Sequence, residues 1–142
     1  MLYDVPVNLG DRSYKIHIGA GILDRIGALC SDVGLKGKCL IITDENVGAL
    51  YAETVFQSLE KAGYAVSTIT MEPGEPTKCG ENVFALQSEC VKAGLDRKGF
   101  IVALGGGVIG DLAGFVAATY LRGIDFVQVP TSLLSMVDSS VG

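Results

Sequence analysis

The stretch FIVALGGGVIGD, residues 100–111, decides the fold because it joins a strand, a turn and the start of a helix. Its first five residues are apolar without a break, as in a strand that is buried on both faces. The glycine cluster predicts a tight turn, and residues 112–118 have the small and apolar side chains of a packed helix. Glycines without Cβ let backbone N–H groups approach an anion, and a helix N-terminus adds unpaired donors. We therefore expect this turn to hold phosphate.

The glycines of this turn have the spacing of a dinucleotide-binding loop. Gly105, Gly107 and Gly110 fit the pattern G-x-G-x-x-G, which alone is a weak signal in a chain with 19 glycines. Asp111 is predicted to lie immediately inside the helix, where a carboxylate would repel a pyrophosphate. We expect Asp111 to face the nicotinamide or the substrate; the alternative is that it merely complements the helix dipole.

Strands and helices are predicted to alternate along the chain. Strands are expected at residues 39–42, 64–70, 100–104 and 126–130, with helices at 22–33, 47–62 and after residue 78. This alternation predicts a single-domain α/β fold, a Rossmann-like parallel sheet covered by helices on both faces. Residues 3–7 and 14–18 alternate apolar and polar side chains around a turn, which predicts an N-terminal β-hairpin. His17 is expected on its polar face, at the surface.

A parallel sheet binds ligands at the C-terminal ends of its strands, and several polar side chains are predicted to lie there. They are Asp44, Glu75, Lys78, Thr131 and Ser132, beside the glycine turn. Asp44 could accept two ribose hydroxyls and repel a 2′-phosphate; alternatively it only helps to cap the next helix, for which Asn46 is the predicted cap. Lys78 could meet a phosphate or ribose oxygen and Glu75 a hydroxyl, although such residues are more often a solvated ion pair.

Composition and charge exclude several classes of function. The net charge is −5 and the 11 basic residues are scattered, so neither nucleic acid nor an anionic membrane is an expected partner. The four cysteines have neither zinc-ligand nor C-x-x-C spacing and are expected to be buried, reduced thiols. No secretory signal is visible at the N-terminus, and the glycines and Asp111 in the apolar stretch 99–118 argue against a membrane span. A cytoplasmic location is expected.

Beyond these patterns, five segments resemble the 3-dehydroquinate synthase family. They are GEPTK at 74–78, GGGVIGDLAGF at 105–115, YLRGI at 120–124, QVPTSLL at 128–134 and VDSSVG at 137–142. Ser132 stands where the family usually has a threonine, and the hydroxyl is kept. The resemblance implies an enzyme of the shikimate pathway, which leads to aromatic amino acids. With NAD and a divalent metal, zinc or cobalt, it would convert 3-deoxy-D-arabino-heptulosonate 7-phosphate to 3-dehydroquinate and phosphate.

The resemblance also implies roles for individual residues. The expected cofactor contacts are Asp44, Glu75, Lys78, Gly106, Gly107, Val108, Asp111, Thr131 and Ser132. Arg122 and Asp138 resemble residues that contact the sugar-phosphate substrate. In the family the arginine reaches the substrate phosphate from the neighbouring subunit, which implies a homodimer. An alternative for Arg122 is that it merely pairs with a helix C-terminus.

The resemblance implies that residues 1–142 form an N-terminal NAD-binding domain. The family's metal ligands, one Glu and two His, belong to a C-terminal helical domain that is absent from this chain. We therefore assign no catalytic or metal-binding residue here and expect the isolated chain to be inactive. The missing domain would leave Leu133, Leu134 and Met136 exposed. Two alternatives remain open: the NAD domain of a metal-dependent polyol or alcohol dehydrogenase, and a non-catalytic nucleotide-binding module.

Overall fold

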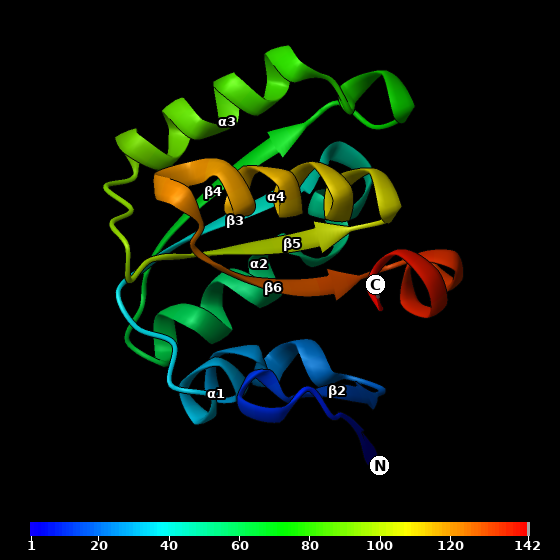
Figure 1. The fold of residues 1–142 in the computed structure, drawn as a ribbon. Helices are drawn as coiled ribbons and strands as arrows, with labels where there is room; N and C mark the ends of the chain where they lie inside the picture. The colour runs from blue at the N-terminus through cyan, green and yellow to red at the C-terminus, as the bar shows by residue number, and fades with distance from the viewer. Residues whose placement is uncertain (142) are drawn as a thin grey trace.

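A parallel sheet with helices on both faces forms the body of the protein in the computed structural model, which describes residues 1–141. The sheet has the order β4-β3-β5-β6 and consists of β3 (Lys38–Asp44), β4 (Ala65–Met71), β5 (Phe100–Gly105) and β6 (Asp125–Pro130). The helices are α1 (Ile26–Asp32), α2 (Glu45–Lys61), α3 (Gly80–Lys92) and α4 (Gly107–Thr119). Figure 1 shows α3 and α4 on one side of the sheet and α1 and α2 on the other. The predicted Rossmann-like α/β fold is confirmed.

Two hydrophobic cores fill the two faces of the sheet. Side chains alternate between the faces along each strand, so Leu40 and Ile42 of β3 pack toward α3 and α4. Cys39 and Ile41 point the other way, toward α1 and α2. All six residues of β5 are buried, which agrees with its unbroken apolar sequence.

The N-terminal hairpin is confirmed, but it forms a separate two-stranded sheet. Strand β1 (Leu2–Val7) pairs antiparallel with β2 (Tyr14–Gly19), and Tyr3 lies opposite Ile18. The apolar face that the sequence pattern predicted is exposed, with Tyr3 59% and Ile18 52% accessible. His17 lies partly exposed on β2, and its Nδ1 lies 2.7 Å from Oδ1 of Asp4. This hydrogen bond lowers the pKa of Asp4.

Three of the four cysteines are buried and free, as predicted. Burial raises the pKa to about 11 for Cys30, about 12 for Cys39 and about 11 for Cys90, so these thiols remain protonated at neutral pH. The prediction is wrong for Cys79, which is partly exposed because it is the N-cap residue of α3, at the edge of the sheet. No helix in the described part of the chain combines the length and apolar character needed to cross a membrane.

Close packing of α1 on α2 depends on a glycine, which leads to a stability prediction. A Cβ on Gly27 would overlap the backbone carbonyl oxygen of Ser58, whereas a Cβ on Gly110 of α4 would meet nothing within 4 Å. We expect Gly27→Ala to destabilise the fold by about 1–3 kcal/mol through overpacking. Gly110→Ala, the matched control, should be neutral or stabilising by up to about 1 kcal/mol, because alanine favours helix. Urea unfolding of both variants measures the difference in the free energy of unfolding. Equal values would contradict the close packing of α1 on α2 at Gly27.

Candidate nucleotide-binding site

The C-terminal ends of all four parallel strands meet at one edge of the sheet. Asp44 is in register with Met71, Thr43 with Leu104, and Gly105 with Pro130. From β3 the chain moves to one side, to β4, and then returns past β3 to form β5 and β6 on the other side. Such a change of direction opens a crevice outside the strand ends, where α/β sheets bind their ligands. Here the crevice lies between the ends of β3 and β5.

The glycine turn begins a helix earlier than predicted. Gly105 ends β5, Gly106 is the N-cap residue, and α4 begins at Gly107, so Asp111 lies one turn inside the helix. The suggestion that Asp111 complements the first-turn dipole is therefore wrong. No side chain among the described residues caps α4, and the N–H groups of its first turn have no helical partner. These N–H groups, including those of Gly107 and Val108, lie where the sequence predicted an anion-binding turn.

Lys78 and Asp111 meet between α3 and α4 although 33 residues separate them. Lys78 Nζ donates to Asp111 Oδ2 at 3.1 Å and lies 3.4 Å from Oε2 of Glu75. The hydrogen bond to Asp111, with the charge of Glu75, raises the pKa of Lys78, so its ammonium stays charged at neutral pH. The alternative of a solvated ion pair with Glu75 alone is therefore incomplete, because Lys78 also pairs with Asp111. Lys78 and Asp111 line a hollow of ≈ 380 Å³ between α3 and α4, with Cys79 and Phe115 on its wall.

Two residues that sequence reasoning missed hold the Lys78 loop in place. Thr77 is 5% exposed, and its hydroxyl donates to the carbonyl of Glu72 at 2.6 Å. The Asn82 side chain donates to the Thr77 carbonyl at 2.8 Å. These bonds brace the loop from both sides and orient Lys78. A threonine within a polar loop gives little sign of burial, but an asparagine in the first turn of a predicted helix is a recognisable capping signal.

Asp44 has two roles available to it, one of which the structure shows directly. Its Oδ1 accepts from the backbone N–H groups of Asn46 and Val47, both at 2.9 Å, so Asp44 caps α2 and the predicted cap, Asn46, is wrong. The helix begins at Glu45 because the residue that ends β3 supplies the cap itself. Among residues 1–141, Oδ2 of Asp44 has no hydrogen-bond partner, so it remains available for a hydroxyl at the crevice.

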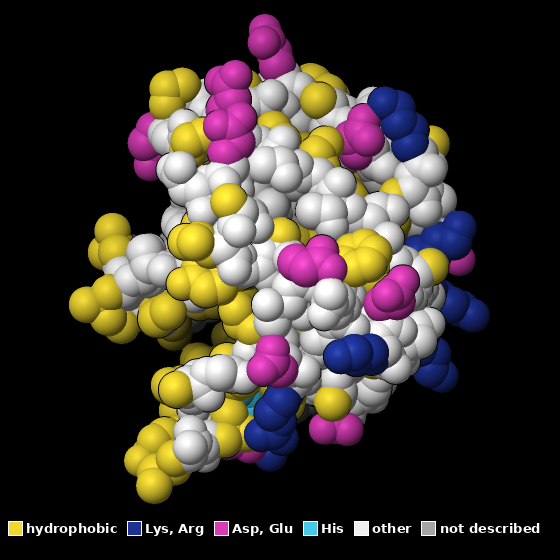
Figure 2. Space-filling view, turned by 180° about the vertical axis from the view of Figure 1, so that it is seen from behind, with side chains coloured by type: hydrophobic (Ala, Val, Ile, Leu, Met, Phe, Trp, Pro, Cys, Tyr) yellow, Lys and Arg dark blue, Asp and Glu magenta, His cyan; other side chains and the backbone are white. Residues whose placement is uncertain are grey.

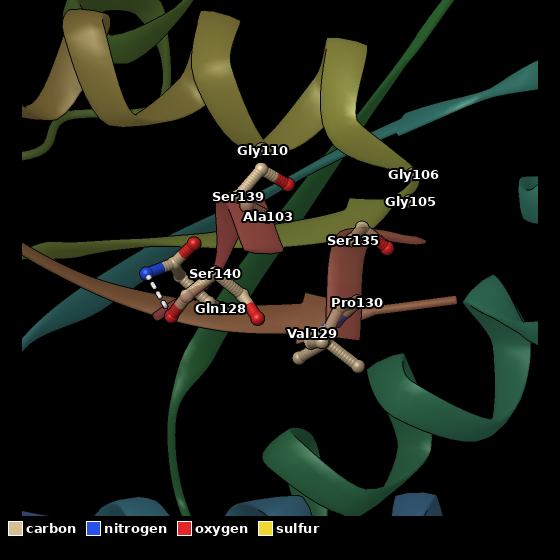
Figure 3. Close-up of a pocket in the computed structure, with 10 residues that line it drawn as sticks. All are labelled: Ala103, Gly105, Gly106, Gly110, Gln128, Val129, Pro130, Ser135, Ser139 and Ser140. Carbon is tan, nitrogen blue, oxygen red and sulfur yellow. Dashed lines mark hydrogen bonds between the residues drawn. The ribbon is translucent and has the colours of Figure 1, made fainter. Parts of the chain in front are cut away.

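Thr131 and Ser132 lie where predicted, directly after β6. The Thr131 N–H donates to the Gly105 carbonyl at 3.0 Å, which ties the end of β6 to the glycine turn. Ser132 faces Gly106: a Cβ on that glycine would lie 3.6 Å from Ser132 Oγ. The segment after Ser132 folds back as a π-helical turn, Ser135–Ser139, over a cavity of ≈ 10 Å³ beside Gly105 and Gly106. Figure 3 shows Ser135 and Ser139 of this turn beside the labelled glycines, and Ser140 beside Gln128.

The two candidate substrate residues lie apart from each other. Asp138 is exposed on the π-helical turn and belongs to the crevice edge. Arg122 follows the C-terminal end of α4, three residues before β6 begins, and therefore lies at the opposite edge of the sheet (Figure 1). The 13 residues of α4 separate it from the glycine turn by about 20 Å.

The backbone around Arg122 is unusual. Leu121 and Arg122 have φ of 49° and 67°, values that non-glycine residues seldom adopt and that often mark functional positions. In the described chain the Arg122 guanidinium makes no hydrogen bond or ion pair, including with the carbonyls that end α4, so the structure does not support the alternative of a helix-terminal partner.

The structure therefore brings some of the predicted site residues together and leaves others apart. The structure brings Lys78, Glu75 and Asp111 together and places Ser132 beside Gly106 and Thr131 at Gly105. Asp44 lies at the end of the neighbouring strand β3, whereas Arg122 lies at the opposite edge of the sheet. Within residues 1–141, no three His, Cys, Asp or Glu side chains are grouped as a metal site.

Sequence comparisons match this chain to one family. The family model described as "3-dehydroquinate synthase N-terminal" matches residues 68–142, more than half of the chain. A 3-dehydroquinate synthase of Citrifermentans bemidjiense is 55% identical over 138 residues, which are 97% of this chain and 38% of the relative. One from Caulobacter vibrioides is 50% identical, over 100% of this chain and 39% of the relative. The chain therefore spans less than half the length of these curated relatives.

Solved structures share the fold over nearly the whole chain. A 2-deoxy-scyllo-inosose synthase complexed with carbaglucose-6-phosphate, NAD⁺ and Co²⁺ superposes with a TM-score of 0.86 at 26% identity, covering 96% of this chain and 37% of that one. The 2-epi-5-epi-valiolone synthase of Streptomyces hygroscopicus, with NAD⁺ and Zn²⁺ bound, gives 0.79 at 28% identity, with 96% and 37% covered. The butanol dehydrogenase A of Thermotoga maritima, at 18% identity and a TM-score of 0.65, shares the fold over 80% of this chain and 31% of its own.

Proposed function

Because this chain belongs to the 3-dehydroquinate synthase family, we propose that it is the NAD-binding domain of an enzyme that converts 3-deoxy-D-arabino-heptulosonate 7-phosphate into 3-dehydroquinate and phosphate. One observation carries the proposal: the open N-terminus of α4, the Lys78–Asp111 pair and Asp44 all lie at the C-terminal edge of one parallel sheet. A nucleotide crevice has this arrangement.

The groups at this edge fit the parts of NAD. The N–H groups that begin α4 suit the pyrophosphate, with Gly106 allowing close approach. Oδ2 of Asp44 suits a ribose hydroxyl, since Oδ1 is engaged in capping α2. Lys78, held by Glu75 and Asp111, suits an oxygen of the phosphate or ribose, and the hydroxyls of Thr131 and Ser132 complete the wall.

When bound, NAD would supply the reversible oxidation of a substrate alcohol, which acidifies the neighbouring C–H and permits loss of phosphate. This chain would hold the cofactor in register with the substrate. We place the reaction in the cytoplasm, where the free thiols of this chain would stay reduced.

We further propose that residues 1–142 are the N-terminal domain and that a C-terminal helical domain supplies the metal ligands. Similar synthases bind Co²⁺ or Zn²⁺, whereas the residues described here offer no suitable group of ligands, and we assign no step of the reaction to a metal on this chain. Figure 2 shows hydrophobic side chains gathered along one side of the molecule, with a hollow between two groups. The hairpin and the last turn supply them: Tyr3, Ile18, Leu133, Leu134 and Val137 are all at least half exposed. Such a surface fits a second domain.

Inactivity of the isolated chain is the expected result. A polypeptide of residues 1–142 with NAD and added zinc should release no phosphate from the substrate over hours, because an open catalytic zinc site usually takes three protein ligands. The exposed apolar side chains should also make it self-associate, which sedimentation would show. Sustained phosphate release by this polypeptide would contradict the proposal that a C-terminal domain supplies the metal ligands needed for catalysis.

Arg122 is proposed to serve the neighbouring subunit of a homodimer. It lies at the edge of the sheet opposite the crevice, its backbone is strained, and it has no partner among residues 1–141. A guanidinium suits the bidentate binding of a substrate phosphate. In the intact enzyme, Arg122→Ala should raise KM for the phosphorylated substrate roughly 10- to 100-fold and leave the Kd of NAD unchanged. Arg97→Ala is the control, because Arg97 is another exposed arginine, in the loop between α3 and β5. A wild-type KM for Arg122→Ala would exclude the role.

Phosphate release distinguishes the proposed synthase from a polyol or alcohol dehydrogenase. The dehydrogenase alternative rests on the shared fold alone, because the dehydrogenase structures are 18–22% identical. The intact protein should release phosphate from 3-deoxy-D-arabino-heptulosonate 7-phosphate over many turnovers without accumulating NADH, since the cofactor is restored in each cycle. NADH accumulating in step with product would support the dehydrogenase. Binding of NAD without either reaction would support the non-catalytic module.

A further inference from the structure

The turn after β6 contains a buried serine whose hydrogen bonds go to a predicted cofactor residue. Ser135 is 2% exposed. Its hydroxyl and backbone N–H make four hydrogen bonds, and all four join it to Ser132. Ser132 is exposed and faces Gly106, whereas Ser135 lies behind it, away from solvent. Ser135 also lines the cavity beside Gly105 and Gly106, but that cavity measures only ≈ 10 Å³, about the size of one water molecule. Toward a ligand as large as a dinucleotide, Ser135 can therefore act only through Ser132.

The pattern of these bonds determines the direction of each hydroxyl proton. Ser135 Oγ lies 2.9 Å from the Ser132 carbonyl oxygen, and a carbonyl can only accept, so the single proton of the Ser135 hydroxyl points there. In the 2.9 Å contact between the two Oγ atoms, Ser132 must then be the donor. The Ser132 N–H, at 3.2 Å, uses the other lone pair of Ser135 Oγ. The single hydroxyl proton of Ser132 is thus committed to Ser135.

We infer that Ser135 is a positioning residue that makes Ser132 a hydrogen-bond acceptor toward the dinucleotide. Ser132 Oγ also accepts from the Ser135 N–H at 3.3 Å, which leaves one lone pair for a ligand. The partner of Ser132 is then a hydroxyl or an amide N–H of the cofactor, because a phosphate oxygen needs a donor. This inference rests on the proposed NAD site. It adds the direction of one hydrogen bond there, in which the cofactor donates and Ser132 accepts.

A double-mutant cycle on the intact protein tests the coupling. We expect Ser132→Ala and Ser135→Ala each to weaken NAD binding about 3- to 10-fold by calorimetry, as for one lost hydrogen bond. The double variant should be no weaker than Ser132→Ala alone, because Ser135 acts only through Ser132. Ser88→Ala, which removes a hydroxyl bonded within α3, is the control and should bind normally. The inference would be overturned if the double variant lost NAD affinity by the product of the two single losses. Wild-type affinity of Ser135→Ala would also overturn it.

A crystal structure of the intact protein with NAD tests the polarity, and it does not require the Ser135 variant to fold. A cofactor hydroxyl or amide nitrogen within 3.5 Å of Ser132 Oγ is the expected result. A phosphate oxygen in that position, or no contact with Ser132, would overturn the inference while leaving the NAD site itself intact. Failure of the wild-type protein to bind NAD would instead refute the proposed function.

Discussion

Lys78→Ala is expected to weaken NAD binding by the intact protein roughly 10- to 100-fold. Lys78 supplies the positive charge between Glu75 and Asp111, at 3.4 and 3.1 Å. Without it, the two carboxylates would face the anionic cofactor unpaired, so the variant would lose an attraction and gain a repulsion. Raised salt should reduce the difference between wild type and variant, because these groups are accessible to solvent.

Lys92 provides the matched control for this experiment. It pairs with Glu89 at the other end of α3, three residues apart as Lys78 and Glu75 are, but away from the strand ends. Lys92→Ala should therefore leave the Kd of NAD unchanged in the same titration. The role of Lys78 is refuted if the two variants bind NAD equally well.

Asp44 is expected to determine the preference for NAD over NADP. Its free Oδ2 would accept from the ribose, and its charge would repel a 2′-phosphate. Asp44→Ala should weaken NAD binding by about 1–3 kcal/mol. It should also destabilise the protein by about 0.5–2 kcal/mol, because the cap of α2 is lost.

Asp44→Asn separates the two roles of this side chain. An asparagine caps a helix about as well as an aspartate, so the thermal midpoint should stay near that of wild type. The amide carries no charge, so the affinity for NADP should rise relative to the affinity for NAD. Calorimetry with both cofactors measures this change. An unaltered ratio of the two affinities in Asp44→Asn would show that Asp44 is only a helix cap.

The fold could be predicted because apolar runs and glycines are local signals. β5 is apolar over consecutive residues and is buried throughout, and each predicted strand of the sheet is present to within a few residues. The start of α4 was predicted too late because Gly107 to Gly110 have low helix propensity, and packing on β5 overrides that preference. The sequence allows both Asn46 and Asp44 as the cap of α2, because both residue types cap well and only the position of the strand end distinguishes them.

The candidate site could be predicted as a set of residues but not as a set of contacts. The resemblance selected Lys78 and Asp111 separately, and their ion pair depends on how α3 and α4 pack on the sheet. Ser135 was not singled out because its role depends on burial behind Ser132, and the Ser-x-x-Ser spacing alone is too common to be informative. Arg122 was predicted to act on a neighbouring subunit, and its place at the far edge of the sheet agrees with that prediction without testing it.

Titration of the ¹⁵N-labelled intact protein with NAD, followed by amide chemical shifts, tests the central claim most directly. If the C-terminal edge of the sheet is the nucleotide crevice, the largest shifts should fall on Gly106, Gly107 and Val108, with further shifts at Asp44, Lys78 and Ser132. The exposed face of the hairpin, around Tyr3 and Ile18, should not respond. Shifts confined to the opposite edge of the sheet, or no change at the glycine turn at saturating NAD, would contradict the account.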